Sequence, residues 1–275
     1  MTIATTDPAA AVRQRYRDES VPAPGDWNDV LAVLHAHRSV RKYVRDDVSD
    51  DKIRTLVSAA QSAATSSNLQ VWSVIAVRDR GRRERLAALA NQQAHIVAAP
   101  VLLVWTADFA RLRQLAATHG TGLAGADYLE SSYVGFIDAA LAAQNAVVAA
   151  ESLGLGTVFI GALRNKPEAV AAELELPPHV FAVFGLVVGV PDPAESAQVK
   201  PRLPQSAVLH HETYDLAAQP DAVVAYERRI ADYYDAQGLA HSWTARVLER
   251  LGSAGSLSGR HRLRDSLVAL GFPLH

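Results

Sequence analysis

The chain has 275 residues, of which 49 % are hydrophobic and 20 % are charged, and its formal net charge is −2. These proportions are typical of a globular protein with a sizeable core, and the near-neutral charge disfavours nucleic acid or an acidic membrane surface as a partner. The chain contains no cysteine, which excludes disulfides, thiolate metal sites and cysteine nucleophiles.

Two features that the sequence lacks bear on its cellular location. The N-terminus shows no basic segment followed by an apolar run, so we expect no signal peptide. No run of about 18 uninterrupted apolar residues occurs, so we expect no membrane-spanning helix. Together with the absence of cysteine, which suits a reducing compartment, this predicts a cytoplasmic protein without a membrane partner.

Residues 1–26 form the first distinct segment. They hold few large apolar side chains and contain three prolines and one glycine. We interpret them as a loosely packed N-terminal arm with a short helix around residues 10–18. Residues 27–275 contain no internal repeat and are predicted to form a single domain.

A strongly basic segment lies between two predicted helices, over residues 27–36 and 49–64. Guanidinium, ammonium and hydroxyl groups placed together can hold a phosphate. The alternative is a solvated basic turn, which the segment taken alone favours because such turns are common. The side chains concerned are His37, Arg38, Ser39, Arg41 and Lys42.

The rest of the chain alternates between strand and helix patterns. The helix over residues 133–153 is apolar on most faces, so we expect it to be buried, packed on another helix or on its own copy in a dimer. The predicted strands cover residues 71–77, 101–105, 157–160 and 181–190. A charged turn over residues 78–85 enters a helix through Leu86 and Leu89, and the other predicted helices cover residues 110–130 with a break at 120–125, 165 onward, 220–235 and 260–270.

Two further polar groups could bind a ligand. Residues 65–68, Thr-Ser-Ser-Asn, end a helix and form either a plain loop or a rim of hydroxyl and amide donors. Prolines hold Lys200 and Arg202 in an extended backbone, so both cations can point the same way.

Metal and acid–base chemistry are not indicated. The pairs His35/His37 and His210/His211 have no carboxylate or cysteine cluster nearby, so we expect no metal. No pair of carboxylates stands out as a general acid and base. Two basic motifs without a general acid and base are typical of a protein that holds a phosphorylated, ring-bearing cofactor, which itself supplies the chemistry.

Six motifs make the chain resemble the FMN-dependent nitroreductase family, and within it the branch of NADPH-dependent, oxygen-insensitive nitroreductases and flavin reductases. Each motif alone is weak, but the set occurs in the family's order and at family-like spacing over residues 27–250. The motifs are His-Arg-Ser-Val-Arg at 37–41, Thr-Ser-Ser-Asn-Leu-Gln at 65–70, Ala-Gln-Asn-Ala at 143–146, Ala-Glu-Ser-Leu-Gly-Leu-Gly at 150–156, Phe-Ile-Gly-Ala-Leu-Arg-Asn at 159–165 and Val-Lys-Pro-Arg-Leu-Pro at 199–204.

The resemblance implies an α+β fold with a central, mostly antiparallel sheet wrapped by helices. It also implies a domain-interlocked homodimer with two FMN sites at the interface, each built from both chains. No side chain is implied to be catalytic, because the flavin carries the chemistry. The implied flavin contacts are His37 and Ser39 at the phosphate, Arg38 as a further contact, Arg41 at the pyrimidine edge, Thr65, Ser67 and Gln93 at the ribityl chain or ring, Phe159, Ile160, Gly161 and Ala162 along the ring, and Lys200 and Arg202 closing the phosphate site.

The implied reaction is a ping-pong oxidoreduction. NADPH or NADH delivers a hydride to N5 of FMN, and a small-molecule acceptor then takes the same place; nitroaromatics, quinones and flavins are the family's usual acceptors. Residues 237–243 lack the arginine with which this branch holds the 2′-phosphate of NADPH, so the choice of donor stays open. Two other functions also stay open: a non-catalytic FMN-binding or regulatory protein, and a specialised flavoenzyme such as a dehalogenase.

Overall fold

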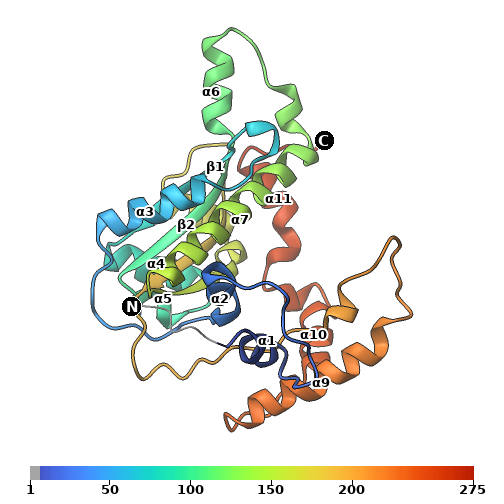
Figure 1. Cartoon of the computed structure of the whole chain (residues 1–275). Helices are drawn as coiled ribbons and strands as arrows, with labels where there is room; N and C mark the ends of the chain where they lie inside the picture. Colours follow the sequence, from blue (N-terminus) through green and yellow to red (C-terminus); the bar gives the residue numbers. More distant parts are fainter. Residues whose placement is uncertain (1–6) are drawn as a thin grey trace. The chain divides into compact units, whose positions relative to one another are not determined.

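The computed structural model describes residues 7–275, and the first six residues of the predicted arm lie outside the described residues (Figure 1). The helices are α1 Pro8–Tyr16, α2 Asp29–Ala36, α3 Asp50–Gln61, α4 Arg80–Leu89, α5 Ala94–Ala98, α6 Ala110–Thr118, α7 Leu129–Ser152, α8 Pro167–Glu173, α9 Gln219–Asp235, α10 Trp243–Leu251 and α11 Leu263–Ala269. The strands are β1 Trp72–Val77, β2 Val101–Asp108, β3 Gly156–Ile160 and β4 Val180–Gly189.

The described chain divides into two compact units. The first holds residues up to 38 and 197–257, with α1, α2, α9 and α10. The second holds residues 39–196 and 258–275, with the sheet and the other helices. The boundary falls between Arg38 and Ser39, so the basic segment contributes residues to both units.

The second unit is built on one four-stranded antiparallel sheet with the strand order β1-β2-β4-β3. Its central strands β2 and β4 pair from Val101 opposite Val188 to Asp108 opposite Val180, with one register shift after Trp105. Every residue of β2 before Asp108 is buried, which confirms the expectation that this apolar run is covered on both faces.

Side chains of β2 alternate between two apolar clusters, as the pleat of a strand requires. Val101, Leu103 and Trp105 belong to the cluster that includes side chains of α3 and α7. Leu102 and Val104 belong to the opposite cluster, with side chains of α4 and α8 and Ile96 of α5. The sheet therefore lies between two layers of helices, and α3 and α7 lie in front of it in Figure 1.

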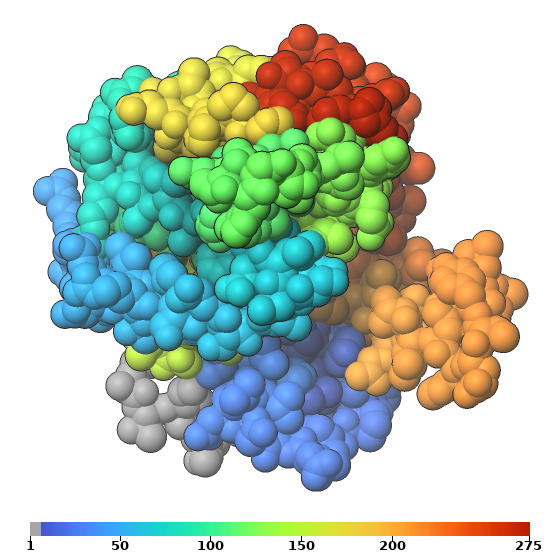
Figure 2. Space-filling view, turned by 90° about the horizontal axis from the view of Figure 1, so that it is seen from above, coloured from blue at the N-terminus to red at the C-terminus, as the bar shows by residue number. Residues whose placement is uncertain are grey.

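The C-terminal residues pack against the segment that leads into α7. The backbone N–H of Leu129 donates to the carbonyl of His275 at 3.3 Å, and the N–H of His275 donates to the carbonyl of Asp127 at 3.0 Å. Figure 2 shows this C-terminal segment, in red, directly beside the green segment that carries α6 and the start of α7. The end of the chain is thus part of the second unit.

The long helix α7 exposes one apolar face. Tyr133, Ile137 and Leu141 recur every four residues, and 57 %, 54 % and 44 % of their surfaces are exposed. The opposite face, which carries Ala139, Ala142 and Ala146, is buried. Among residues 7–275, α7 is the one helix long and apolar enough to span a membrane, a test that core helices of soluble proteins also pass. The predicted burial is therefore met on one face, while the other has no partner within the described chain.

The first unit packs around α9. Tyr226, Ile230 and Tyr233 form one buried face of this helix, against which Leu203 and Trp243 pack. The short helix expected in the N-terminal arm is confirmed by α1. The arm is not loosely packed there, because Val12 and Arg15 of α1 are buried.

One predicted helix is confirmed closely and another begins earlier than predicted. The helix predicted over residues 220–235 is α9, which ends at Asp235; Gly238 then adopts a positive φ of 72°, and α10 starts after Ser242. The Ser242 hydroxyl oxygen accepts a hydrogen bond from the N–H of Ala245 at 3.1 Å, which makes it the N-cap. The core helix α7 begins at Leu129, four residues before its predicted start.

Candidate functional site

Within the first unit, Arg15 joins the two basic motifs. Its Nη1 donates to the carbonyl oxygen of Lys200 at 2.9 Å, and its Nη2 donates to the carbonyl oxygens of His37 at 2.7 Å and His35 at 2.8 Å. The N–H of Arg202 donates back to the carbonyl of Arg15 at 3.1 Å. Arg15 is only 8 % exposed, so these bonds form away from bulk water. The backbones of residues 37 and 200 are therefore held at one place by a residue of α1.

The cations at this place lack acidic partners. In the part of the chain that the structure describes, none of Arg38, Lys200 and Arg202 forms an ion pair with a carboxylate. The ammonium group of Lys200 instead donates to the hydroxyl of Tyr234 at 2.8 Å. Positive charge without a counterion favours an anionic ligand, and guanidinium groups suit phosphate in particular.

The other half of the basic segment is fixed in the second unit. The N–H of Val40 donates to the carbonyl of Thr157 in β3 at 2.9 Å, and Ser39 pairs with Thr157 as a parallel bridge. The carboxylate of Glu195 accepts the backbone N–H groups of Arg41 at 2.6 Å and Lys42 at 2.9 Å. These bonds place Ser39 and Arg41 at the start of β3 and leave the Arg41 side chain exposed.

The loop over residues 65–70 is held by a buried carboxylate of α7. Asp138 is 1 % exposed and accepts hydrogen bonds from the hydroxyl of Thr65 and from the N–H of Ser66 at 3.1 Å. Ser67, Asn68 and Gln70 all have positive φ, between 50° and 54°. Left-handed backbone in residues other than glycine costs of order 1 kcal/mol or more each, and such strain gathers at functional sites. The loop is therefore preformed, and the Thr65 hydroxyl is engaged within it.

Gln93 lies beside a second strained turn and close to an unpaired histidine. Asn91 and Gln92 have φ of 59° and 55° and lead into α5. The Nε2 atom of His95 is buried and has no hydrogen-bond partner. Burial lowers the pKa of His95 below its ordinary value, and the nearby charge of Arg41 lowers it further. An orphaned polar atom beside an arginine suits a ligand that can donate or accept a hydrogen bond there.

The turn after β3 offers backbone and one aromatic ring. Phe159 is 41 % exposed and packs edge-on against Phe184, with ring centroids 5.1 Å apart. The side chains of Ile160 and Ala162 are buried in the core. A ligand at this turn can therefore meet the Phe159 ring and the backbone of residues 160–162, but not the Ile160 or Ala162 side chains.

The structure does not gather the predicted residues of the second unit in one place. Thr65 and Ser67 precede β1 at one edge of the sheet, and residues 159–162 end β3 at the other edge, with β2 and β4 between them. Strands are spaced by about 4.8 Å, so the two edges lie roughly 14 Å apart. Ser39 and Arg41 belong to the β3 edge. The loop over residues 65–70 belongs instead to a separate cavity of about 390 Å³, together with Trp72 and Arg111.

Four residues that support these segments are not marked by any sequence motif. Arg15 stands in the predicted arm and acts through backbone carbonyls; Asp138 stands inside an apolar helix; and Glu195 stands in a polar stretch. A lone charge inside an apolar helix, as at Asp138, is the one signal that could have been followed. Nothing in the sequence marks His95, because the effect of Arg41 on its pKa is visible only in the structure.

The chain is similar to known proteins along most of its length. The profile of the Nitroreductase family matches residues 34–190, and the profile of the C-terminal domain of that family matches residues 200–275. FMN reductase [NAD(P)H] of Bacillus subtilis is 41 % identical over 208 residues, 75 % of this chain and 83 % of the relative. The Cr(VI) reductase of Pseudomonas sp. is 37 % identical over 246 residues, 88 % of this chain and 98 % of the relative. Among solved structures, NfrA2 of B. megaterium has a TM-score of 0.85 and 37 % identity, and the match covers 90 % of this chain and 100 % of that one.

Proposed function

The chain belongs to the nitroreductase family, and we propose that it is an FMN-dependent NAD(P)H oxidoreductase that reduces small oxidised acceptors. The relatives' names support this, since one is an FMN reductase using NAD(P)H and another reduces Cr(VI). The observation that carries the proposal is the union of the two basic motifs by Arg15, which leaves three cations at one place without carboxylate partners.

The residues present fit FMN, which combines one phosphate with one flat, largely apolar ring. Arg38, Lys200 and Arg202 of the first unit suit the phosphate because none of them forms an ion pair with a carboxylate within the described chain. The half-exposed ring of Phe159 and the backbone of the turn after it suit the flavin ring. When bound, FMN takes a hydride from NAD(P)H and passes the electrons to an acceptor.

The protein's own contribution is binding and electrostatics. Arg41 supplies a fixed positive charge, which favours the negative charge that reduction places on a flavin ring. Glu195 fixes the backbone of Arg41, and the unpaired Nε2 of His95 lies close enough for the arginine's charge to lower its pKa. Asp138 holds Thr65 and Ser66, and with them the loop that carries Ser67, so these residues contribute without the cost of ordering a loop on binding. No protein side chain is needed as a general acid or base, because the flavin carries the chemistry.

We further propose that the protein is a homodimer, with each flavin site completed by the other copy. The apolar stripe of Tyr133, Ile137 and Leu141 on α7 supports this, because such a stripe on a core helix calls for a partner. The separation of the two sheet edges supports it too, since Thr65 and Ser67 of one copy can serve the β3 edge of the other.

We also propose that the protein acts in the cytoplasm, a reducing compartment that suits a chain without cysteine.

Both NADPH and NADH are proposed as donors. The segment over residues 237–243 has no arginine, and the neighbouring arginines of α10 are already engaged. Arg246 pairs with Glu249 at 2.6 Å, and Arg250 donates to the carbonyl of Ser256. The 2′-phosphate of NADPH therefore finds no free guanidinium in this segment, which favours modest discrimination between the donors.

The test is an anaerobic titration of protein reconstituted with FMN. We expect NADPH and NADH, added separately, each to bleach the visible absorbance of the flavin, and a nitroaromatic or a quinone to restore it. A halogenated aromatic is then added to the reduced protein. If no halide is released, the function differs from that of a dehalogenase. Flavin bands that persist with both donors would show a flavin-binding protein without reductase activity, and failure to take up FMN would overturn the proposal.

A further inference from the structure

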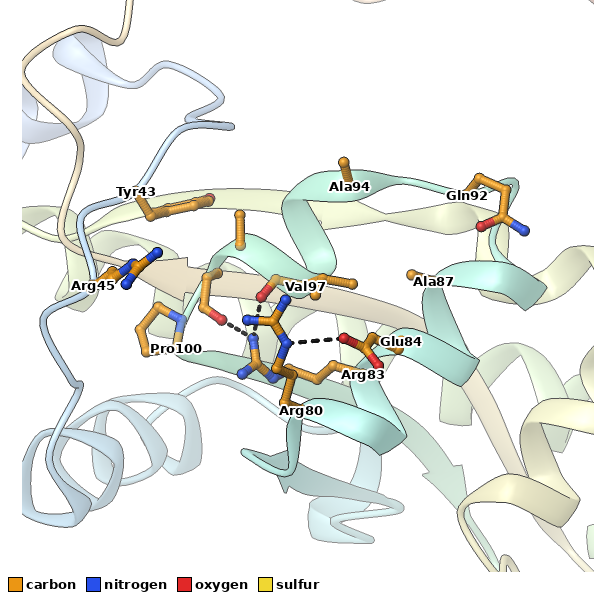
Figure 3. Close-up of a pocket in the computed structure, with 12 residues that line it drawn as sticks. Tyr43, Arg45, Arg80, Arg83, Glu84, Ala87, Gln92, Ala94, Val97 and Pro100 are labelled. Atoms are coloured by element: carbon orange, nitrogen blue, oxygen red, sulfur yellow. Dashed lines mark hydrogen bonds and ion pairs between the residues drawn. The ribbon is translucent and has the colours of Figure 1, made fainter.

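A second, arginine-lined cavity adjoins one predicted flavin contact, Gln93, whose neighbours Gln92 and Ala94 both line it. It has a volume of about 840 Å³ and is formed by α4, α5, the residue before β2 and the segment that follows the basic motif (Figure 3). None of the thirteen predicted flavin contacts lines it. The volume falls in the range of about 300–1,000 Å³ that is usual for small-molecule sites.

One wall holds a buried guanidinium without a counterion. Arg83 is 7 % exposed, and its Nη1 donates to the carbonyl oxygens of Val97 at 2.8 Å and Ile96 at 3.3 Å, and to that of Ala99. These are carbonyls of the last turn of α5, so Arg83 caps that helix end. Its Nε atom is buried without a partner. Its charge therefore remains uncompensated by any carboxylate in direct contact.

The other arginines of α4 differ from Arg83 in this respect. Arg82 and Arg85 both pair with Glu173, at 3.3 and 2.8 Å, outside the cavity. Arg80 pairs with Glu84 at 2.9 Å inside it. Burial lowers the pKa of the Arg83 guanidinium, and the like charge of Arg80 lowers it further. The charges of Asp79 and Glu84 act in the opposite direction and offset part of this repulsion, and an anion bound between the two arginines would offset more of it.

The opposite wall adds another free cation. Arg45 is exposed and makes no ion pair within the described residues, and Figure 3 places it beside Tyr43 and Pro100. The hydroxyl of Tyr43 is engaged, because it donates to the carbonyl of Val40 at 2.6 Å. The charged lining therefore consists of three arginines and the single carboxylate of Glu84.

Apart from the amide of Gln92, the rest of the lining is apolar and mostly without bulk. It comprises short side chains of α4 and α5, with Pro100 and the ring of Tyr43, which leave room for a flat ring against them. The residues are Ala87, Ala94, Val97, Ala98 and Ala99.

We propose that this cavity is a second binding site, for an organic phosphate of nucleoside monophosphate size. Arg45 and Arg80 contact the phosphate, Arg83 supplies charge behind them, and the base lies against the alanines of α4 and α5. Three guanidinium groups carry more positive charge than the single carboxylate of Glu84 can neutralise, and their forked donors match phosphate oxygens. Because none of the predicted flavin contacts lines the cavity, its occupant acts as a modulator or as a second ligand and not as the redox cofactor.

The test is calorimetric binding of AMP to protein saturated with FMN. We expect AMP to bind, and adenosine and inorganic phosphate each to bind at least about tenfold more weakly, because each retains only half of the interactions. Arg45→Ala is expected to weaken AMP binding about tenfold or more. Arg54→Ala, which removes an exposed arginine of α3 outside the cavity, is the matched control and should leave it unchanged.

A second variant separates ligand binding from structural damage. Glu84→Gln keeps the side chain's size, removes the competing carboxylate and frees Arg80, so AMP should bind several-fold more tightly. A purely structural role for these residues would give no tightening. Equal binding of AMP and adenosine, an unchanged affinity in Arg45→Ala, or displacement of FMN by AMP would overturn the proposal.

Discussion

The buried guanidinium of Arg15 donates to the carbonyl oxygen of Lys200, 185 residues further along the chain, at 2.9 Å. The same side chain binds the carbonyl of His37 at 2.7 Å. Two basic motifs that are far apart in sequence are thus held together by a helix that precedes both of them. The flavin site that we propose depends on this junction for its phosphate pocket.

Arg15→Ala is expected to weaken FMN binding at least about tenfold and to lower the free energy of unfolding by about 2–4 kcal/mol, because three carbonyls lose a charged donor. Denaturant unfolding and fluorescence titration with FMN measure the two effects. Arg13→Ala removes a partly exposed arginine from the same helix and serves as the control. A folded Arg15→Ala variant with full FMN affinity would show that the junction does not shape the site.

Asp138→Ala is expected to release the loop over residues 65–70, because the buried carboxylate is the partner of both Thr65 and Ser66. The strained residues of the loop should relax, so FMN affinity should fall more than tenfold. Asp138→Asn retains one acceptor oxygen, so its FMN affinity should lie between those of the parent protein and Asp138→Ala. Glu130→Ala, an exposed acidic residue of the same helix, is the control. If the alanine variant bound FMN like the parent protein while its loop resisted proteolysis, the carboxylate would have no positioning role.

Ile137→Glu with Leu141→Glu is expected to convert the proposed dimer into monomers, because two charges cannot be buried unpaired in an apolar interface. Light scattering after size-exclusion chromatography gives the mass directly. Flavin binding should fall together with dimerisation, since each site draws on both copies. Leu115→Glu changes a leucine on α6 that is 54 % exposed, as Ile137 is, and should leave the mass unchanged. A parent protein that is already a monomer would rule out the shared site.

His95 predicts a particular dependence of stability on pH. Its pKa in the folded protein lies below the ordinary 6.5, first because of burial and then because of Arg41. Below that ordinary value the unfolded chain binds a proton that the folded chain does not, so stability falls as the pH falls through this window. His95→Gln should flatten the fall between pH 7 and the lowered pKa, measured by urea unfolding at several pH values. Arg41→Ala should make the stability depend less on pH in this window, because it brings the pKa of His95 back toward 6.5. An identical slope in the parent protein and His95→Gln would contradict this.

The sheet was predictable because its strands are apolar and short. Residues 101–105 and 181–190 carry continuous apolar runs, and both proved to be central strands with neighbours on each side. The motifs around residues 37–41 and 199–204 were predictable as basic clusters because charge is visible in the sequence. The family assignment followed from the order of such motifs and is supported along the chain.

The supporting contacts were not predictable, for physical reasons. Arg15 binds backbone carbonyls, and any residue supplies a carbonyl, so no partner could be read from residue types. The left-handed residues of the loop over 65–70 are serine, asparagine and glutamine, which also occur in ordinary turns. The exposed stripe of α7 looks like core in sequence, because an apolar side chain carries no mark of whether its partner lies in the same chain.

The most direct test of the account compares FMN with riboflavin, which has the same ring and lacks the phosphate. If the joined basic motifs hold the phosphate, the flavin-free protein should bind FMN at least about 100-fold more tightly than riboflavin. Lys200→Ala with Arg202→Ala should reduce that preference to less than about tenfold while leaving riboflavin affinity unchanged. Equal affinity for the two flavins in the parent protein, or an undiminished preference in the double variant, would contradict the account.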